Sequence, residues 1–418
     1  MDNVQNRGTV VVIGAGIVGV STAIWLQRAG HHVTLVDRLE PGEGTSYGNA
    51  GVLASSGVVP VTTPGLVGKA PGMLLDPMSP LFLRWSYLPR LAPWLVRYLS
   101  HCTVEHTRRI TGLIHGIVAG SLDEHQALAE GTPAKRWIAP SDYVYVYQDR
   151  ATFEADAFTW ELRRDHGVVW SELQGAALTA YEPALGPACG FAAACHGNGH
   201  IKDPGRYVKD LARHAIDRGA NFIKARATDF VKDGGKVTAV ITDAGAIPCR
   251  AAVIATGAWS KALTARAGTT VPLETERGYH IELYDTNIMP RAPLMIAAGK
   301  FVATPMDGRL RLAGIVEFGG LAAPPSEAPY RLLLARAREA LPGLTWQREE
   351  RWMGHRPAPS DSVPVIGELP DTKGVFAGFG HHHIGLTGGP RTGRLLADMI
   401  VGRRPNVDIA NYGPVRFK

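Results

Sequence analysis

Residues 9–37 read TVVVIGAGIVGVSTAIWLQRAGHHVTLVD, and this stretch decides the fold. Its first five residues, 9–13, are mostly β-branched and predict a buried parallel strand. A helix is expected over 17–28, and residues 32–36 predict a second strand that ends at Asp37. The order of strand, glycine-rich turn, helix, strand and acidic residue is typical of a doubly wound α/β unit that binds a dinucleotide.

The turn between the first strand and the helix, GAGIVG at 14–19, has the GxGxxG spacing. Gly14 permits the tight turn, Gly16 lets the backbone approach a pyrophosphate, and Gly19 lets the helix pack closely on the strand. The helix N-terminus offers N–H groups and a positive dipole end to the phosphates. Asp37 stands 18 residues after Gly19, where a carboxylate can accept hydrogen bonds from ribose hydroxyls.

The type of dinucleotide is indicated by the segment that follows. Arg38 does not distinguish FAD from NAD, but the position of the glycine motif near the start of the chain favours FAD. So does GTSYGNAG at 44–51, whose small residues can run along a pyrophosphate and ribitol; the alternative is an ordinary surface loop. The FAD contacts expected from this part of the chain are Gly14, Ala15, Gly16, Ile17, Val18, Gly19, Asp37, Arg38, Thr45, Ser46, Asn49, Ala50 and Gly51.

The composition is that of a globular protein. The chain has 418 residues, 45% hydrophobic and 20% charged, which excludes a mainly disordered chain and leaves room for two or three folded units. The 44 basic and 38 acidic residues give a net charge of +6, but the basic residues are dispersed, so nucleic-acid binding is not expected. The four cysteines match no CxxC or zinc-site spacing and are expected to be free thiols in a reducing compartment.

Localisation and membrane contact depend on two segments. The first residues, MDNVQNRG, contain no signal-peptide hydrophobic region, so a cytoplasmic protein without a transmembrane helix is expected. The proline-rich and aromatic block 77–99 allows two interpretations. It either covers the cofactor as part of a substrate-binding unit or forms a peripheral contact on the inner face of the cell membrane. In the second case the aromatic residues at headgroup level would be Trp85, Tyr87, Trp94 and Tyr98.

Two later segments repeat the strand–glycine–helix pattern. An apolar strand at 252–254 leads into TGAW at 256–259, which predicts another strand end beside the nucleotide. A short strand at 375–377 leads into a glycine-rich loop at 378–389, and a helix is expected from about Pro390. Its N-terminus could face the ring edge where negative charge develops on flavin reduction. The FAD contacts expected from these segments are Thr256, Gly257, Trp259, Gly380, Gly385, Leu386 and Thr387.

With these motifs the chain resembles the FAD-dependent D-amino-acid oxidase superfamily, and bacterial D-amino-acid dehydrogenases most closely. The matching stretches are GAGIVG (14–19), TSYGNAGVL (45–53), the block 77–99, HIKDPGRYVKDLA (200–212), ATGAWS (255–260) and GHRPAPSDSVPVIG (354–367). The resemblance implies an α/β fold with a Rossmann-like FAD-binding domain and a second, α+β substrate domain built on a mixed β-sheet. The expected domain boundaries are 1–76, 197–270 and 351–418 for FAD, and 77–196 and 271–350 for substrate.

The resemblance also implies oxidative deamination of a D-amino acid to a 2-oxo acid by hydride transfer from Cα to flavin N5. Electrons would pass to a quinone or another respiratory-chain acceptor, and cyclic imino acids such as D-proline or hydroxy-D-proline are candidate substrates. Two alternatives stay open: an O₂-using amine oxidase for glycine or sarcosine, and a non-catalytic flavin subunit of a heteromeric dehydrogenase. The triple histidine at 381–383 departs from the family pattern and leaves the particular amino acid open.

Three residues are the expected catalytic set. By resemblance, Arg356 clamps the substrate carboxylate with its guanidinium, the alternative being a structural ion pair. Tyr279 would add a hydroxyl hydrogen bond to that carboxylate, or be a core tyrosine. His280, like His355, would tune the protonation of the substrate amine, or pack in the core. No metal site is expected from the consecutive histidines 381–383, because adjacent residues of an extended loop point in different directions.

Overall fold

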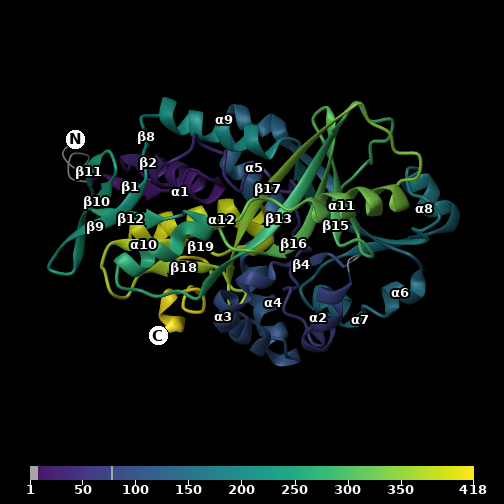
Figure 1. Cartoon of the computed structure of the whole chain (residues 1–418). Coiled ribbons are helices and arrows are strands. Elements are labelled where there is room, and N and C mark those ends of the chain that lie inside the picture. The colour runs from purple at the N-terminus through teal and green to yellow at the C-terminus, as the bar shows by residue number, and fades with distance from the viewer. Residues whose placement is uncertain (1–7, 77–78) are drawn as a thin grey trace.

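The computed structural model describes residues 8–76 and 79–418. Pro77 and Met78, the first residues of the proline-rich block, lie outside the described residues, as does most of the N-terminal segment MDNVQNRG. Two large sheets organise the chain (Figure 1). The six-stranded sheet lies to the left of this view and the ten-stranded sheet to the right.

The six-stranded sheet has the order β18-β19-β12-β1-β2-β8. Its strands are β1 (Val10–Ile13), β2 (Val33–Asp37), β8 (Asn221–Lys224), β12 (Ala251–Ile254), β18 (Val365–Glu368) and β19 (Val375–Phe379). β1 pairs in parallel with both β2 and β12, and β12 pairs in parallel with β19. The carboxyl ends of β1, β2 and β12 therefore meet at one edge, as the sequence predicted for a nucleotide-binding sheet.

The ten-stranded sheet is mixed, with the main order β17-β13-β16-β15-β14-β5-β7-β3 and with β4 beside β16 and β6 beside β7. Its strands are β3 (Val52–Leu53), β4 (Leu81–Leu83), β5 (Ile138–Tyr147), β6 (Trp170–Gln174), β7 (Phe191–Ile201), β13 (Leu273–Tyr284), β14 (Leu294–Ile296), β15 (Phe301–Met306), β16 (Arg309–Phe318) and β17 (Arg348–Pro359). Residues 351–359, placed by the sequence in the FAD-binding domain, belong to β17 of this sheet.

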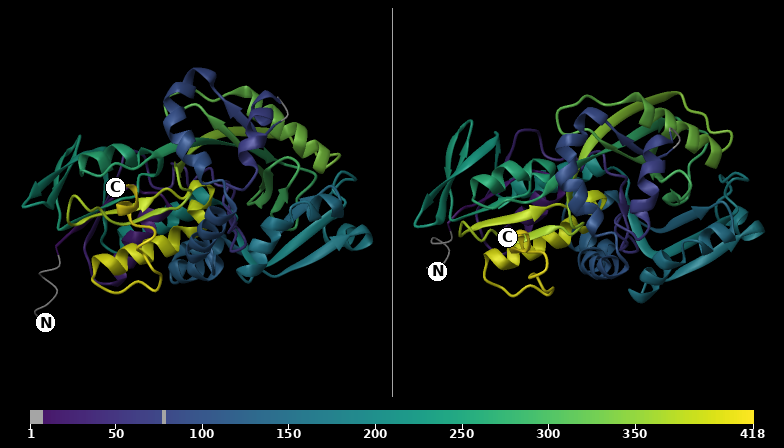
Figure 2. Two further views of the ribbon diagram at one scale, coloured as in Figure 1. Left: turned by 90° about the horizontal axis from the view of Figure 1, so that it is seen from below. Right: turned by 60° about the horizontal axis from the view of Figure 1, so that its bottom comes forward.

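Helices cover both sheets, and a small sheet of β9 (Ala227–Asp233), β10 (Lys236–Thr242) and β11 (Gly245–Pro248) lies at the far edge (Figure 1). The α-helices are α1 (Ile17–Arg28), α2 (Leu66–Leu75), α3 (Leu88–Ser100), α4 (Val104–Val118), α5 (Ser121–Ala129), α6 (Arg150–Glu154), α7 (Ala157–Asp165), α8 (Gly175–Tyr181), α9 (Pro204–Asp217), α10 (Ser260–Arg266), α11 (Glu327–Ala340) and α12 (Gly385–Ile400). α12 lies beside α4 and α5 (Figure 2), which join the core of the nucleotide-binding half.

α1 and α12 pack closely because glycines of α12 face α1. A Cβ atom on Gly389 would lie 2.8 Å from Ile17 Cγ1, and one on Gly393 would lie 2.6 Å from both Ser21 Cβ and Thr22 N. These contacts leave no space for a larger residue without moving a helix. The glycines at 389 and 393 therefore permit contact between helices.

The helix expected from Pro390 begins five residues earlier, at Gly385, and Pro390 lies inside it. A proline at this place removes the N–H that would bond to the carbonyl of Leu386. The imidazole of His125 supplies the missing donor, with its Nε2 2.9 Å from the Leu386 oxygen. The prediction of a loop through residue 389 was therefore wrong, because a side chain from α5 compensates for the proline.

Residues 197–205 contain three glycines and a proline, a composition typical of a loop, but 197–201 are the end of β7. His200 pairs with Val52 of β3, and Ile201 pairs with Ile138 of β5. The glycines weaken the local strand pattern, and the strand is stabilised by partners that are distant in sequence. Asp203 then caps α9 by accepting a hydrogen bond from Arg206 N.

The proline-rich block folds as β4, a 3₁₀ turn and α3, and two of its aromatic residues lie in the core. Trp94 and Tyr98 are 6% and 4% exposed and stack on each other with ring centroids 4.5 Å apart. Trp94 also donates to the carbonyl of Ala358, which fixes α3 on β17. The headgroup interpretation is therefore wrong for these two residues, while Trp85 is exposed. Within the described residues, no helix is both long and apolar enough to cross a membrane.

Candidate active site

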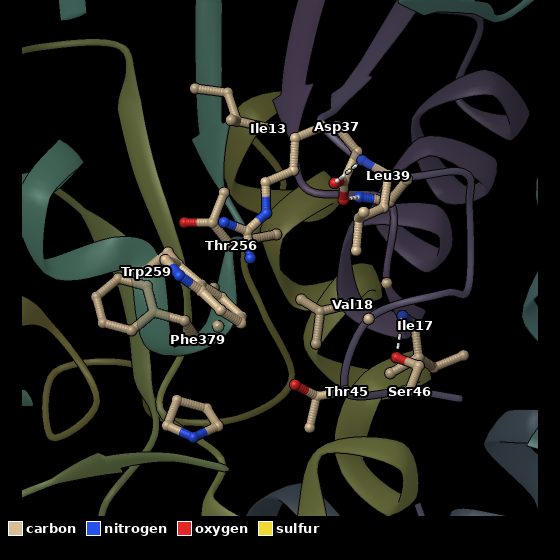
Figure 3. A pocket seen from close by; sticks show the side chains of 18 of the residues that line it. Ile13, Ile17, Val18, Asp37, Leu39, Thr45, Ser46, Thr256, Trp259 and Phe379 are labelled. Carbon is tan, nitrogen blue, oxygen red and sulfur yellow. Dashed lines mark hydrogen bonds between the residues drawn. The ribbon is translucent and has the colours of Figure 1, made fainter. Parts of the chain in front are cut away.

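A cavity of about 510 Å³ opens at the carboxyl ends of β1, β2 and β12 (Figure 3). It runs from Asp37 past the start of α1 and the segment 44–51 to the start of α12. Expected contacts that line it are Ala15, Gly16, Ile17, Val18, Asp37, Arg38, Thr45, Ser46, Asn49, Thr256, Gly257, Trp259, Gly385 and Leu386. Segments from both ends of the chain thus form one elongated cavity.

The start of α1 is organised by two side chains that line this cavity. Ser46 Oγ accepts a hydrogen bond of 3.0 Å from Ile17 N, the first helical residue. Asp37 accepts 2.7 Å from Ala15 N and 3.0 Å from Leu39 N, so its carboxylate is held at the end of β2 (Figure 3). The carboxylate and the helix N-terminus are therefore fixed at the positions that the glycine motif predicted for the ribose and the pyrophosphate.

Arg38 and Trp259 form one wall of the cavity, with the guanidinium 4.1 Å from the ring centroid. This cation–π contact joins β2 to the turn after β12. Several further lining residues were not expected from the sequence: some lie within the segments already described, at 44 and 379–382, and the others carry no glycine or polar motif. These further residues are Leu39, Gly42, Gly44, Ala225, Arg226, Ala227, Thr228, Ala262, Leu263, Arg266, Pro357, Phe379, His381 and His382, among others.

The other expected FAD contacts are not among the residues that line the cavity. Gly14 and Gly19 lie just behind it: Gly14 has φ +110°, and a Cβ on Gly19 would lie 1.8 Å from the carbonyl of Gly14. They perform the turn and packing tasks of the motif. The remaining four instead support neighbouring backbone: Ala50 O accepts from Thr304, Gly51 pairs with Asn49, Gly380 packs on Pro359, and Thr387 bonds to Val52 O.

A buried arginine of β16 fixes the backbone of segment 44–51 on the ten-stranded sheet. Arg311 is fully buried and donates to the carbonyls of Tyr47 and Asn49, while it pairs with Glu282. Burial alone would raise the pKa of Glu282, but Arg311 and Arg309 lower it to about 2. This network keeps Glu282 ionised and holds the cofactor segment on the ten-stranded sheet. Nothing in the local sequence marks it, because Glu282 and Arg311 lie on different strands.

Arg356 lies at the junction of β13, β16 and β17. Its guanidinium packs over Gly278 and donates to the carbonyls of Gly314 and Ile315 at 3.1 and 3.0 Å. Ile315 has φ +57° and is the extra residue of a β-bulge, which turns these carbonyls towards the arginine. The structural alternative expected for Arg356 was an ion pair, whereas its bonded partners are backbone carbonyls. These two bonds use only part of the donor set of a guanidinium.

Glu276 lies directly opposite Arg356 on the neighbouring strand and is 3% exposed. His382 Nδ1 is 3.4 Å from Glu276 Oε1. Burial alone would raise the pKa of Glu276, but His382, Arg356 and His383 together hold it below its usual value. An ionised carboxylate and a guanidinium therefore stand side by side next to His382; His382 lines the cavity, whereas Glu276 and Arg356 lie behind it and are not among the lining residues.

Tyr279 and His280 do not line the cavity. The hydroxyl of Tyr279 donates to Glu317 and accepts from Ser326 N, and its ring packs on Tyr330 of α11. Tyr279 thus lies in the core on the side of β13 opposite Glu276, as in the alternative expected for it.

His280 is stacked on Trp352, and its Nδ1 is 3.1 Å from the carbonyl of Gly48. Burial, followed by the charge of Arg311, lowers the pKa of His280 to about 3, so the ring is neutral at physiological pH. His355 bonds to Thr275 and touches Trp259, and burial lowers its pKa to about 4. Burial therefore favours the neutral form of both rings, which fits the packing alternative expected for them.

The cavity suits FAD on two structural grounds. The first is space at Gly16, where an added Cβ would meet only Ser46 Oγ, at 3.1 Å. The second is that α1 and α12 both begin at the cavity, and neither N-terminus has a side-chain cap on its N-cap residue. A helix N-terminus stabilises a phosphate or a developing negative charge. Residues of the motif and segment 44–51 would hold the nucleotide, and the start of α12 would face the ring.

Comparison with known proteins gives the family. A family model described as DAO, FAD dependent oxidoreductase, matches residues 9–399. The chain is 40% identical over 415 residues to a D-amino-acid oxidase of Bradyrhizobium diazoefficiens, covering 98% of each chain. It is 31% identical over 424 residues to a D-amino acid dehydrogenase of Paramagnetospirillum magneticum, again covering 98% of each.

Solved structures show the same fold. A glycine oxidase of Geobacillus kaustophilus has a TM-score of 0.74 at 22% identity, over 98% of this chain and 99% of that chain. An L-proline dehydrogenase of P. horikoshii also has a TM-score of 0.74, at 19% identity and 98% coverage of each. With the family match over most of its length, the chain belongs to the DAO family of FAD-dependent oxidoreductases and has FAD as its cofactor.

Proposed function

We propose that this protein oxidises the Cα–N bond of a free D-amino acid, giving an imino acid that water converts to the 2-oxo acid. The observation that carries the proposal is the pairing of Arg356 with Glu276 near the end of the FAD cavity lined by His382. The names of the two relatives reported above support the D configuration. Bound FAD would supply the two-electron acceptor for the hydride from Cα.

The charges of this pair match those of a zwitterion. Arg356 offers a guanidinium fork to the α-carboxylate, and Glu276 offers a negative charge to the α-ammonium group. Opposed residues on antiparallel strands have Cβ atoms about 5 Å apart, a spacing suited to two groups attached to one carbon. The arrangement favours small free amino acids with both groups intact over simple amines or simple acids.

Flavin reduction by a panel of amino acids and amines tests this proposal. Anaerobic holoenzyme is mixed with D-amino acids including D-proline and hydroxy-D-proline, with the matching L-amino acids, and with glycine and sarcosine, while the loss of flavin absorbance is followed. Bleaching by D-amino acids is expected. Bleaching only by L-amino acids, or only by N-methyl amines, would overturn the substrate class. No bleaching by any amine would favour the non-catalytic subunit.

For the electron acceptor we propose a quinone or another respiratory-chain component, a choice that the relative named a dehydrogenase supports. The relative named an oxidase supports O₂ as the second candidate. Stopped-flow reoxidation of the substrate-reduced enzyme by O₂ and by a soluble quinone separates the two. Reoxidation by the quinone at least about 100-fold faster than by O₂ at equal concentration supports the dehydrogenase; the reverse ratio supports the oxidase.

We also propose a peripheral membrane contact through the exposed part of α3 and the turn before it. Trp85 is 59% exposed and Val96 70% exposed, and Arg90 and Arg97 are exposed beside them. Such a mixture of aromatic, aliphatic and basic side chains suits an anionic bilayer surface. Co-sedimentation with vesicles of phosphatidylglycerol and phosphatidylcholine is expected, with loss of binding in Trp85→Ser. Equal sedimentation of the variant would exclude this surface.

A further inference from the structure

We propose that His382, supported by Glu276, accepts the proton that the substrate ammonium group loses before oxidation. This inference rests on the proposed amino-acid oxidation. An amine can donate its electron pair only when it is neutral, whereas a free amino acid carries an ammonium group at neutral pH. One proton must therefore leave the ammonium group, to water or to a basic side chain at the site, and the structure offers few such side chains.

The two histidines expected to act on the substrate amine, and two other titratable side chains of the region, are engaged elsewhere. His280 bonds to the carbonyl of Gly48, and His355 bonds to Thr275. The hydroxyl of Tyr279 is held between Glu317 and Ser326 on the other side of β13. His381 Nε2 lies 2.9 Å from the hydroxyl of Thr392 in α12.

His382 differs from these residues in both burial and bonding. It is 7% exposed, and neither of its ring nitrogens has a hydrogen-bond partner within the described part of the chain. Its backbone has φ +47°, a conformation that is costly for a residue with a side chain and that occurs mostly at functional sites. Because a buried imidazole normally makes hydrogen bonds, a ring whose Nδ1 faces Glu276 at 3.4 Å and whose Nε2 has no partner in residues 8–76 and 79–418 points to a ligand that this position is built to meet.

The hydroxyl of Tyr98 is a second buried polar atom without a partner among the residues described, and its ring lies 6.5 Å from that of His382. Tyr98 comes from α3 and His382 from the turn before α12, so two segments distant in sequence each bring a buried polar side chain close to Glu276. Glu276 interacts with both, since its charge contributes to the raised pKa of Tyr98, after burial. The cluster of Tyr98, Glu276 and His382 is thus suited to an ammonium group.

The charged and titratable groups around His382 come from four elements. Glu276 faces it from β13, Arg356 from β17, and Tyr98 from α3, while His381 and His383 flank it in its own turn. Burial lowers the pKa of His383 to about 4 and that of His381 to about 3. Both neighbours are therefore neutral near pH 7, and Glu276 is the charge able to stabilise an imidazolium at position 382.

The step conserves charge within the site. An N–H bond of the substrate ammonium breaks, an N–H bond forms on the imidazole, and the positive charge moves from substrate to His382. The Glu276 carboxylate, 3.4 Å from Nδ1, pairs with that charge. The amine is left neutral with its electron pair on nitrogen, while Arg356 keeps the carboxylate.

The test is the pH dependence of anaerobic flavin reduction by D-alanine, or by whichever amino acid reduces wild type fastest. His382→Asn removes the base, and asparagine tolerates the positive φ. Its kcat/KM for reduction is expected to fall about 100-fold at pH 7 and to recover towards pH 10, where the free substrate loses its own proton. Glu276→Gln should also lower kcat/KM at pH 7, by a smaller factor, and should likewise recover towards pH 10.

Binding of propionate, which has a carboxylate but no amine, gives a readout besides activity. Its affinity, measured by the shift in flavin absorbance, is expected to be unchanged in His382→Asn. His196→Gln is the matched control, because His196 forms an exposed pair with Asp142 at 2.9 Å and should keep the wild-type pH profile.

Three outcomes distinguish the ideas. A wild-type pH profile in both His382→Asn and Glu276→Gln, or a deficit that is equal at every pH, would overturn the role of His382 as proton acceptor. If wild type itself is reduced by no amino acid, the proposed function fails first. If His382→Asn does not retain FAD, Glu276→Gln alone decides through the shape of its pH profile.

Discussion

The imidazole of His125 occupies the place of the backbone N–H that Pro390 lacks. Its Nε2 donates to the Leu386 carbonyl at 2.9 Å, and its Nδ1 accepts from the hydroxyl of Tyr207 at 2.8 Å. Because a carbonyl can only accept, this pairing fixes the neutral tautomer. A side chain of α5 thus completes the first turn of α12, which begins at the FAD cavity.

Replacing His125 by leucine is expected to destabilise the protein. It would leave the Leu386 carbonyl and the Tyr207 hydroxyl buried and unpaired, at about 1–3 kcal/mol for each group. Thermal unfolding followed by flavin release should show a lower Tm. His32→Leu, at an exposed histidine, is the control, and equal Tm values for the two variants would contradict the bridging role.

Stability is expected to fall on the acid side of neutrality. Burial is the main cause that lowers the pKa of His125 to about 4 and those of His280 and His381 to about 3. The unfolded chain binds a proton at each histidine near pH 6.5, whereas the folded chain does so only near pH 3–4. Between these values the unfolded state holds more protons, so stability falls as pH falls.

Each such histidine lowers the free energy of unfolding by up to about 1.4 kcal/mol for each pH unit of acidification. The Tm of the apoprotein, measured from pH 8 to pH 5, is expected to decrease below about pH 6.5. His125→Leu should show a shallower decrease than wild type, because one titrating group is gone. A Tm that stays level down to pH 5 would contradict the neutral state of these rings.

The packing of α1 on α12 makes Gly393 intolerant of any side chain. Gly393→Ala would place a Cβ 2.6 Å from Ser21 Cβ, which is expected to cost about 1–3 kcal/mol and to weaken FAD retention, since both helices begin at the cavity. Gly68→Ala is the matched control in α2, where an added Cβ meets no atom within 4 Å. That variant should be neutral or slightly more stable. Similar losses in both variants would argue against the packing explanation.

Asp37→Asn tests the nucleotide end of the cavity separately from catalysis. The amide oxygen can still accept a hydrogen bond, but the charge that would bind the ribose hydroxyls is lost. FAD affinity, measured by titration of the apoprotein, is expected to weaken about 10-fold to 100-fold. Reduction of the fully loaded variant by substrate should remain close to wild type. Unchanged FAD affinity would remove Asp37 from the binding set.

Arg356→Lys tests the carboxylate end. Lysine keeps the charge but loses the planar fork, so KM for the amino acid should rise about 10-fold to 100-fold while FAD content stays unchanged. An unchanged kcat/KM would show that Arg356 serves only to hold the carbonyls of Gly314 and Ile315.

The sequence was sufficient for the nucleotide-binding unit because its determinants are local. Residues 9–37 contain strand, turn, helix, strand and acid in one continuous stretch, and the structure places Gly14, Gly16, Gly19 and Asp37 in the turn, packing and cavity positions that the spacing predicts. The sequence did not identify the cavity wall at 225–228, since these residues reach the cavity only through the pairing of β8 with β2.

The substrate side was decided by the tertiary structure alone. Along β13 successive side chains point to opposite faces, so Glu276 faces Arg356 and His382 while Tyr279 faces α11. Whether the even-numbered or the odd-numbered side chains of β13 face Arg356 and His382 depends on how β13 pairs with β17 and on the bulge at Ile315 in β16. Those partners are distant in sequence. A strand's own residues specify that it alternates, but only its neighbours determine which side meets the cofactor.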